Sequence, residues 1–114
     1  MKVTRLRVEG EGLDRLIGSL RDKLPDCHTY TSDHVVVLAS EKTYFRIESN
    51  LLTVIILDVS VPDRYEIELV TGGGGHGPFA FTFGAERDRS TKVIRFLEQI
   101  CAANGWSLVG QYVN

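Results

Sequence analysis

A glycine-rich run contains the residue types that best fit a ligand-binding site. The sixteen residues from Thr71 to Glu86 read TGGGGHGPFAFTFGAE and include six glycines. Glycine loses more backbone entropy on folding than any other residue, so such a run is expected where a ligand needs close backbone approach or free amide groups. The candidate ligand-binding residues are Gly72, Gly73, Gly74, Gly75, His76 and Gly77.

The chemistry that suits this run is the binding of a small anion, such as a nucleotide or a phosphorylated metabolite. Consecutive glycine amides can form an anion-binding nest, and His76 could assist. The dinucleotide fingerprint requires a helix directly after the glycines, whereas Pro78 and an alternating Phe pattern follow here. The P-loop pattern fails because no Gly-Lys-Ser/Thr is present. The alternative is a flexible or bulged connection whose glycines adopt positive φ.

A second group of reactive residue types lies within nine positions, namely Asp26, Cys27, His28, Asp33 and His34. These are metal-ligand types, but their spacing matches no C-x-x-C or H-x-x-x-H pattern. Cys27 and His28 are neighbours, and neighbours in a strand point to opposite faces, so they cannot easily act as nucleophile and base. We therefore expect a polar connection here, with no catalytic residue, no metal and no cofactor.

Basic residues near the C-terminus follow helical spacing at Arg89, Lys92 and Arg95. Acidic neighbours dilute them, and the formal net charge of the chain is −2. A solvated helix face is favoured, and we expect no nucleic-acid partner.

The composition is that of one globular domain covering residues 1–114, with 43% hydrophobic and 25% charged residues. No signal-like apolar run follows the N-terminal Met1–Arg7, and the longest apolar stretch, Leu51–Val59, is too short to span a bilayer as a helix. Two cysteines do not make a disulfide framework. We expect a soluble cytoplasmic protein with no membrane partner.

Apolar periodicity predicts the elements that must position these residues. Helical stripes run from Leu13 to Leu24, before Pro25, and from about Glu86 to Asn104. A short turn at Glu41–Lys42 is expected inside a four-strand meander. The strands are expected at 2–8, 34–40, 43–49, 51–60, 64–70, Phe79–Phe83 and Trp106–Val113.

These elements predict an α+β fold with two layers, in which an antiparallel sheet, largely a meander, carries two helices packed on one face. The other face of the sheet would stay partly wet. Alternation predicts that it displays Arg5, Arg7, Arg46, Glu48, Arg64, Glu66 and Glu68, with Tyr44 as an aromatic anchor.

The function that this pattern favours is a non-enzymatic binding or assembly module that forms a homodimer. The prediction depends on the apolar central strands and on the sheet face left uncovered, although that face also carries charges. The alternative is a binder of a small anionic ligand through residues 72–77.

The pattern GGGG-x-G-x-x-x-F-x-F-G-A-E, which leads into an amphipathic final helix, resembles a family of small uncharacterised prokaryotic proteins of similar length. The resemblance is strongest over Gly72–Glu86 and the helix after it. It implies an α+β domain of unknown function, in which the glycine run is a family feature and no catalytic role is carried over.

Overall fold

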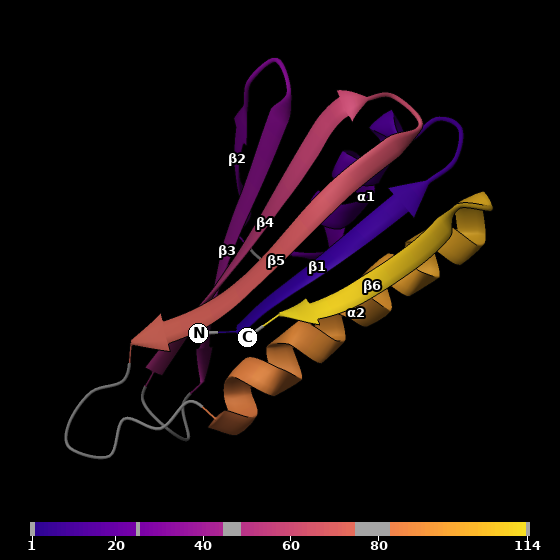
Figure 1. The fold of residues 1–114 in the computed structure, drawn as a ribbon. Helices are drawn as coiled ribbons and strands as arrows, with labels where there is room; N and C mark the ends of the chain where they lie inside the picture. The colour runs from indigo at the N-terminus through magenta and orange to yellow at the C-terminus, as the bar shows by residue number, and fades with distance from the viewer. Residues whose placement is uncertain (1, 25, 45–48, 75–82, 114) are drawn as a thin grey trace.

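The computed structural model describes residues 2–24, 26–44, 49–74 and 83–113. At residues 2, 42–44, 49–51, 73–74, 83–91 and 111–113 the backbone alone is described. The elements in chain order are β1 (Lys2–Glu9), α1 (Asp14–Lys23), β2 (His28–Thr31), β3 (Val35–Tyr44), β4 (Ser49–Val61), β5 (Arg64–Gly74), α2 (Phe83–Asn104) and β6 (Ser107–Val113) (Figure 1).

The strands form one antiparallel sheet of six strands in the order β2-β3-β4-β5-β1-β6. The apolar strand predicted at 51–60 is central, as β4. Figure 1 shows the sheet from its uncovered side, with both helices behind it. The predicted α+β fold, an antiparallel sheet with two helices, is confirmed. Within the described residues, neither helix is long and apolar enough to cross a membrane.

The core lies between the helices and one face of the sheet. Alternation in β4 buries Thr53, Ile55 and Leu57 on that face. The helices meet them with one stripe each, because helical spacing puts apolar side chains on one side. These stripes include Leu16 and Leu20 of α1 and Val93, Leu97 and Ile100 of α2.

Two predicted boundaries in the meander are wrong. The predicted turn at Glu41–Lys42 is continuous strand, because both residues pair with β4, at Leu52 and Leu51. The strand predicted at 43–49 is therefore divided: Thr43 and Tyr44 end β3, Ser49 begins β4, and residues 45–48, with Arg46 and Glu48, lie outside the described residues. The fourth strand of the meander is instead β2, which the sequence pattern missed.

The glycine run also begins differently from its prediction. β5 continues to Gly74, because Gly72 and Gly73 pair with Leu52 and Leu51 of β4. Phe83 is the first residue of α2 and does not end a strand, so the helix begins three residues before the predicted Glu86. Phe79 and Phe81 lie outside the described residues.

A buried tryptophan closes the end of the sheet where β1 turns into α1. Trp106 is 6% exposed, and its Nε1 donates a hydrogen bond to the carbonyl oxygen of Glu11 at 2.6 Å. The Arg15 guanidinium carbon lies 5.7 Å from the centroid of the ring. The N–H of Gly10 donates to the carbonyl oxygen of Asp63 at 3.0 Å, which ties this corner to the turn between β4 and β5.

Candidate functional site

The uncovered face of the sheet carries every large hydrophobic side chain that is exposed among the described residues. These are Tyr30, Leu52, Val61 and Val109, with 60%, 45%, 36% and 59% of their surface exposed. Residues opposite each other in an antiparallel pair project to the same side. Tyr30 pairs with Val37, Val61 with Arg64 and Val109 with Arg7, all on the face opposite the one that α1 and α2 cover. Leu52 projects there because its neighbour Thr53 is buried on the helix side.

Half-buried side chains join two of these residues, Tyr30 and Leu52, into a continuous apolar band. One row crosses four neighbouring strands through the register pairs Ala39 with Val54, Val54 with Val70 and Val70 with Val3. The next row pairs Val37 with Ile56. We call these residues, together with Tyr30 and Leu52, the apolar band; all are half-buried except Tyr30 and Leu52, which are exposed.

Charged side chains occupy the part of the same face that lies over β5 and β1. Arg7 Nε lies 2.7 Å from Glu66 Oε1, and Arg7 Nη1 lies 3.8 Å from Glu9 Oε1. Arg5 stands opposite Glu68 in the register. Arg7 and Glu66 therefore form an ion pair across β1 and β5. Because both side chains are about half exposed, the pair contributes about 0–1 kcal/mol to stability.

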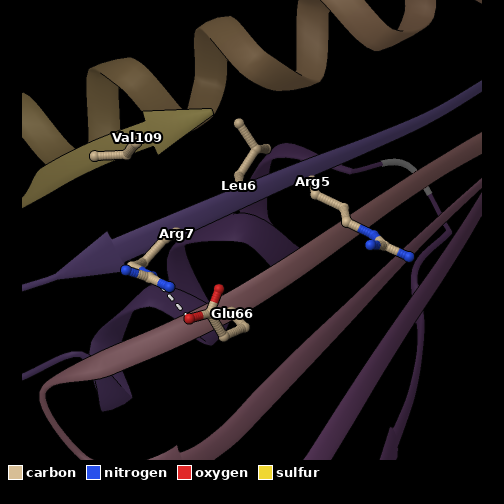
Figure 2. Close-up of a pocket in the computed structure, with 5 residues that line it drawn as sticks. All are labelled: Arg5, Leu6, Arg7, Glu66 and Val109. Carbon is tan, nitrogen blue, oxygen red and sulfur yellow. Dashed lines mark hydrogen bonds and ion pairs between the residues drawn. The ribbon is translucent and has the colours of Figure 1, made fainter. Parts of the chain in front are cut away.

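A shallow hollow lies beside this ion pair, as Figure 2 shows. Its volume is about 200 Å³, and it is lined by Arg5, Leu6, Arg7, Glu66 and Val109. Arg7 and Glu66 point toward each other, whereas Arg5 extends from β1 across β5. Small-molecule sites occupy about 300–1,000 Å³, so this hollow suits a contact group of a partner surface better than an enclosed substrate.

Asp58, at the edge of the charged region, is held in its ionised form by Ser60. The hydroxyl of Ser60 donates to Asp58 Oδ1 at 2.6 Å and its backbone N–H donates at 3.0 Å. These hydrogen bonds, the hydroxyl first, lower the pKa of Asp58 below its ordinary value of 3.8, and the charge of His34 acts in the same direction.

We expect Ser60→Ala to raise the pKa of Asp58 toward 3.8, because the stronger of the two hydrogen bonds is lost. A lowered pKa means that Asp58 stabilises the fold above its unfolded pKa, and that this stability is lost as the pH falls through the folded pKa. The variant should lose part of that contribution. An NMR titration of the Asp58 carboxyl carbon measures the shift, and an unchanged midpoint in the variant would contradict the assignment.

The candidate glycine residues are divided by the end of β5. Gly72, Gly73 and Gly74 pair with Leu52, Leu51 and Asn50, so the β4 ladder uses part of their backbone hydrogen-bonding capacity. Gly75, His76 and Gly77 lie outside the described residues. The pairing places Gly72 beside Leu52, at the edge of the apolar band. Ligand binding by residues 72–77 stays a prediction.

The Asp, Cys and His group is spread over a connection and the edge of the sheet. Asp26 adopts a positive φ of 45° between α1 and β2, and His28, Asp33 and His34 are exposed. Cys27 Sγ lies 3.8 Å from the carbonyl oxygen of His28, so its hydrogen bond is to backbone. In the part of the chain that the structure describes, no three His, Cys, Asp or Glu side chains could hold a metal together.

The two free cysteines differ in burial. Cys27 is half-buried and lines a hollow of about 350 Å³ with Gly18, Arg21 and Asp22, whereas Cys101 is only 2% exposed. Burial raises the pKa of the Cys101 thiol.

Because the thiolate is the reactive form, Ellman's reagent should modify Cys27 in the native protein and Cys101 only on unfolding. Cys27→Ser should remove the reaction with Ellman's reagent that is seen in the native protein. Equal rates of modification of both thiols in the native protein would contradict the burial of Cys101.

The basic residues of α2 are not part of the uncovered face. Arg95 is exposed and Lys92 half-buried on a helix of the opposite layer. The side chain of Arg89 lies outside the described residues.

Sequence reasoning missed part of the apolar band. Tyr30 lies on β2, which was not predicted, and it supplies the exposed aromatic residue; the side chain of Tyr44 lies outside the described residues. The available signal was the run at 51–57, where Leu52, Val54 and Ile56 are apolar at positions that alternate with the core residues. A strand with apolar residues on both faces indicates that both faces pack against other parts of a structure.

Comparison with family models, with curated proteins and with solved structures finds no match to this chain. The resemblance to small prokaryotic proteins therefore stays a prediction.

Proposed function

We propose that this chain is a small non-enzymatic assembly module that forms a homodimer through the uncovered face of its sheet. The observation that supports this best is the apolar band, which runs across β3, β4, β5 and β1 on that face and includes the exposed Tyr30 and Leu52. A contiguous apolar patch is a feature of interaction surfaces, because leaving it in water has a free-energy cost that burial removes.

The size of the face is sufficient for a specific dimer. Five neighbouring strands about 4.8 Å apart, each presenting three or four side chains, offer about 500 Å² per copy. Two copies would bury about 1,000 Å², which is near the lower limit for a specific interface. A moderate affinity is expected from such an area. The free thiols of Cys27 and Cys101 fit the cytoplasmic location that we propose with it.

Sedimentation velocity of the wild-type protein, from micromolar to millimolar concentration, tests the proposal. The chain has a mass of 12.7 kDa, and the proposal expects a shift to twice that mass as the concentration rises. A monomer throughout that range would contradict it.

A second function, the binding of a small anion by residues 72–77, has one structural observation in its favour. The β1 ladder reaches Thr71, opposite Lys2, whereas β5 continues to Gly74. Part of the glycine backbone therefore extends past the described end of β1. A thermal-shift assay with ATP and inorganic phosphate tests this function: a rise in Tm that Gly74→Val removes would support it, and no rise would contradict it for those anions.

A further inference from the structure

We infer that the two copies pack about a two-fold axis that runs parallel to the strands, between β5 and β1. This inference rests on the proposed homodimer and assigns its geometry. In this arrangement the acidic residues Glu66 and Glu68 of one copy face the basic residues Arg7 and Arg5 of the other.

The observation behind it is a pair of oppositely charged columns at matching levels. Glu66 and Glu68 lie on β5, and Arg7 and Arg5 lie directly opposite them on β1. Arg5, Arg7 and Glu66 are exposed, and Glu68 is half-buried. The uncovered face therefore carries one acidic column beside one basic column, as the labelled side chains of Figure 2 show in part.

Symmetry decides how these columns meet in a face-to-face dimer. Rotation about a two-fold axis parallel to the strands leaves the height of each residue along the strand direction unchanged and reverses the order of the strands. If the axis lies between β5 and β1, β5 of one copy therefore faces β1 of the other, and each acidic column lies over a basic one. A two-fold axis across the strands would place each strand over its own copy, so Glu would meet Glu and Arg would meet Arg. Like charges brought together repel, and this second arrangement is disfavoured.

Part of the apolar band agrees with the same axis: the overlapping strands are β4, β5, β1 and β6, whereas β2 and β3 lie beyond the edge of the partner's sheet. Val70 and Val3 are register partners on β5 and β1, at the level next to Arg5 and Glu68. Rotation about the proposed axis places Val70 of one copy over Val3 of the other, so apolar side chains meet where the charged columns end. Face-to-face sheets pack with their strands within about 30° of each other, which this axis permits.

The charged columns are expected to set the orientation of the dimer more than its affinity. Ion pairs at an interface lose hydration as they form, so their net gain is small, whereas a like-charge contact has a large cost. The apolar side chains of the overlapping strands, namely Val54, Ile56, Val70 and Val3, supply the favourable burial.

Charge reversal of one column at a time tests the axis. Arg5→Glu/Arg7→Glu makes both columns acidic, and Glu66→Arg/Glu68→Arg makes both basic. Each variant alone should have a dimer dissociation constant raised at least about 100-fold. An equimolar mixture should form a heterodimer with an affinity near that of wild type, because every acidic column then meets a basic one.

The matched control is the four-residue variant that exchanges the two columns within one chain. It keeps the pairing within each copy and between copies, so it should dimerise as wild type does even if a single-column variant folds poorly. Circular dichroism checks the fold of each. Single-column variants that dimerise as wild type, or a mixture that stays monomeric while each variant is folded, would overturn the axis and leave the homodimer standing. A monomeric wild type would overturn the homodimer itself.

Discussion

Gly10→Val should lower the free energy of unfolding by about 2–4 kcal/mol, as overpacking and a weakened hydrogen bond add. A Cβ at Gly10 would lie 2.3 Å from Trp106 Cδ1 and 3.0 Å from Cγ, far inside contact distance. The ring cannot easily retreat, because its Nε1 is bonded to the carbonyl of Glu11 and the ring is buried. Either Trp106 moves out of the core or the Gly10–Asp63 hydrogen bond is strained. Urea denaturation followed by tryptophan fluorescence measures the loss.

Gly18→Ala provides the matched control for this substitution. Gly18 lies within α1, and a Cβ there would meet nothing within 4 Å. Because glycine is a poor helix former, the alanine should raise the free energy of unfolding by about 0.5–1 kcal/mol. If Gly10→Val unfolds at the same urea concentration as wild type, the close packing of Gly10 on Trp106 is wrong.

Ile56→Lys should raise the dissociation constant of the homodimer by about a thousand-fold, since the interface would have to remove water from the lysine ammonium, which costs several kcal/mol even beside an acidic neighbour. Ile56 is half-buried in the apolar band, on the central strand β4. Its register partner on β5 is Glu68, so a lysine has an acidic neighbour in the monomer. The fold of the single chain should therefore survive while the interface does not. Sedimentation equilibrium of the variant measures the change.

Ala102→Lys adds the same charge elsewhere. Ala102 is exposed on α2, in the layer opposite the uncovered face. This variant should dimerise as wild type does. Equal weakening by both lysines would point to net charge as the cause, and an Ile56→Lys variant that dimerises normally would exclude this face as the interface.

The helices and the central strands could be predicted because their signals are local. Leu16 and Leu20 repeat at helical spacing, and β1 and β5 alternate cleanly between core and charged residues. β2 could not be predicted, because His28–Thr31 has four residues, of which three are exposed, and it lies at the edge of the sheet beside β3. Nothing in a polar segment of that length distinguishes it from a loop until a neighbouring strand is present.

The same limit explains the turn wrongly predicted at Glu41–Lys42 and the C-terminal end of β5, which was predicted at residue 70. Glu41 and Lys42 have turn-like residue types, yet pairing with β4 keeps them extended, and the exposed Glu41 is tolerated on the uncovered face. Gly72 and Gly73 have little β propensity of their own, and the same strand holds them in the ladder. In both places the pairing of distant residues overrides the local preference.

The charged residues of the uncovered face could be predicted from the sequence, whereas the apolar band could be predicted only in part. Alternation alone places Arg5, Arg7 and Glu66 on one face. The apolar band needs two further facts that no local pattern contains: which face the helices cover, and that β2 adds Tyr30 to the edge. His76, the side chain that could assist anion binding by the glycine run, lies outside the described residues.

The most direct test of the homodimer is an isotope-filtered NMR experiment on a mixture of labelled and unlabelled wild-type protein, which detects only contacts between copies. Packing through the uncovered face predicts intermolecular contacts from the methyl groups of Val54, Ile56 and Val70 and none from core methyls such as Leu97. Intermolecular contacts confined to α2, or a sample of dimer mass with none from the apolar band, would contradict it.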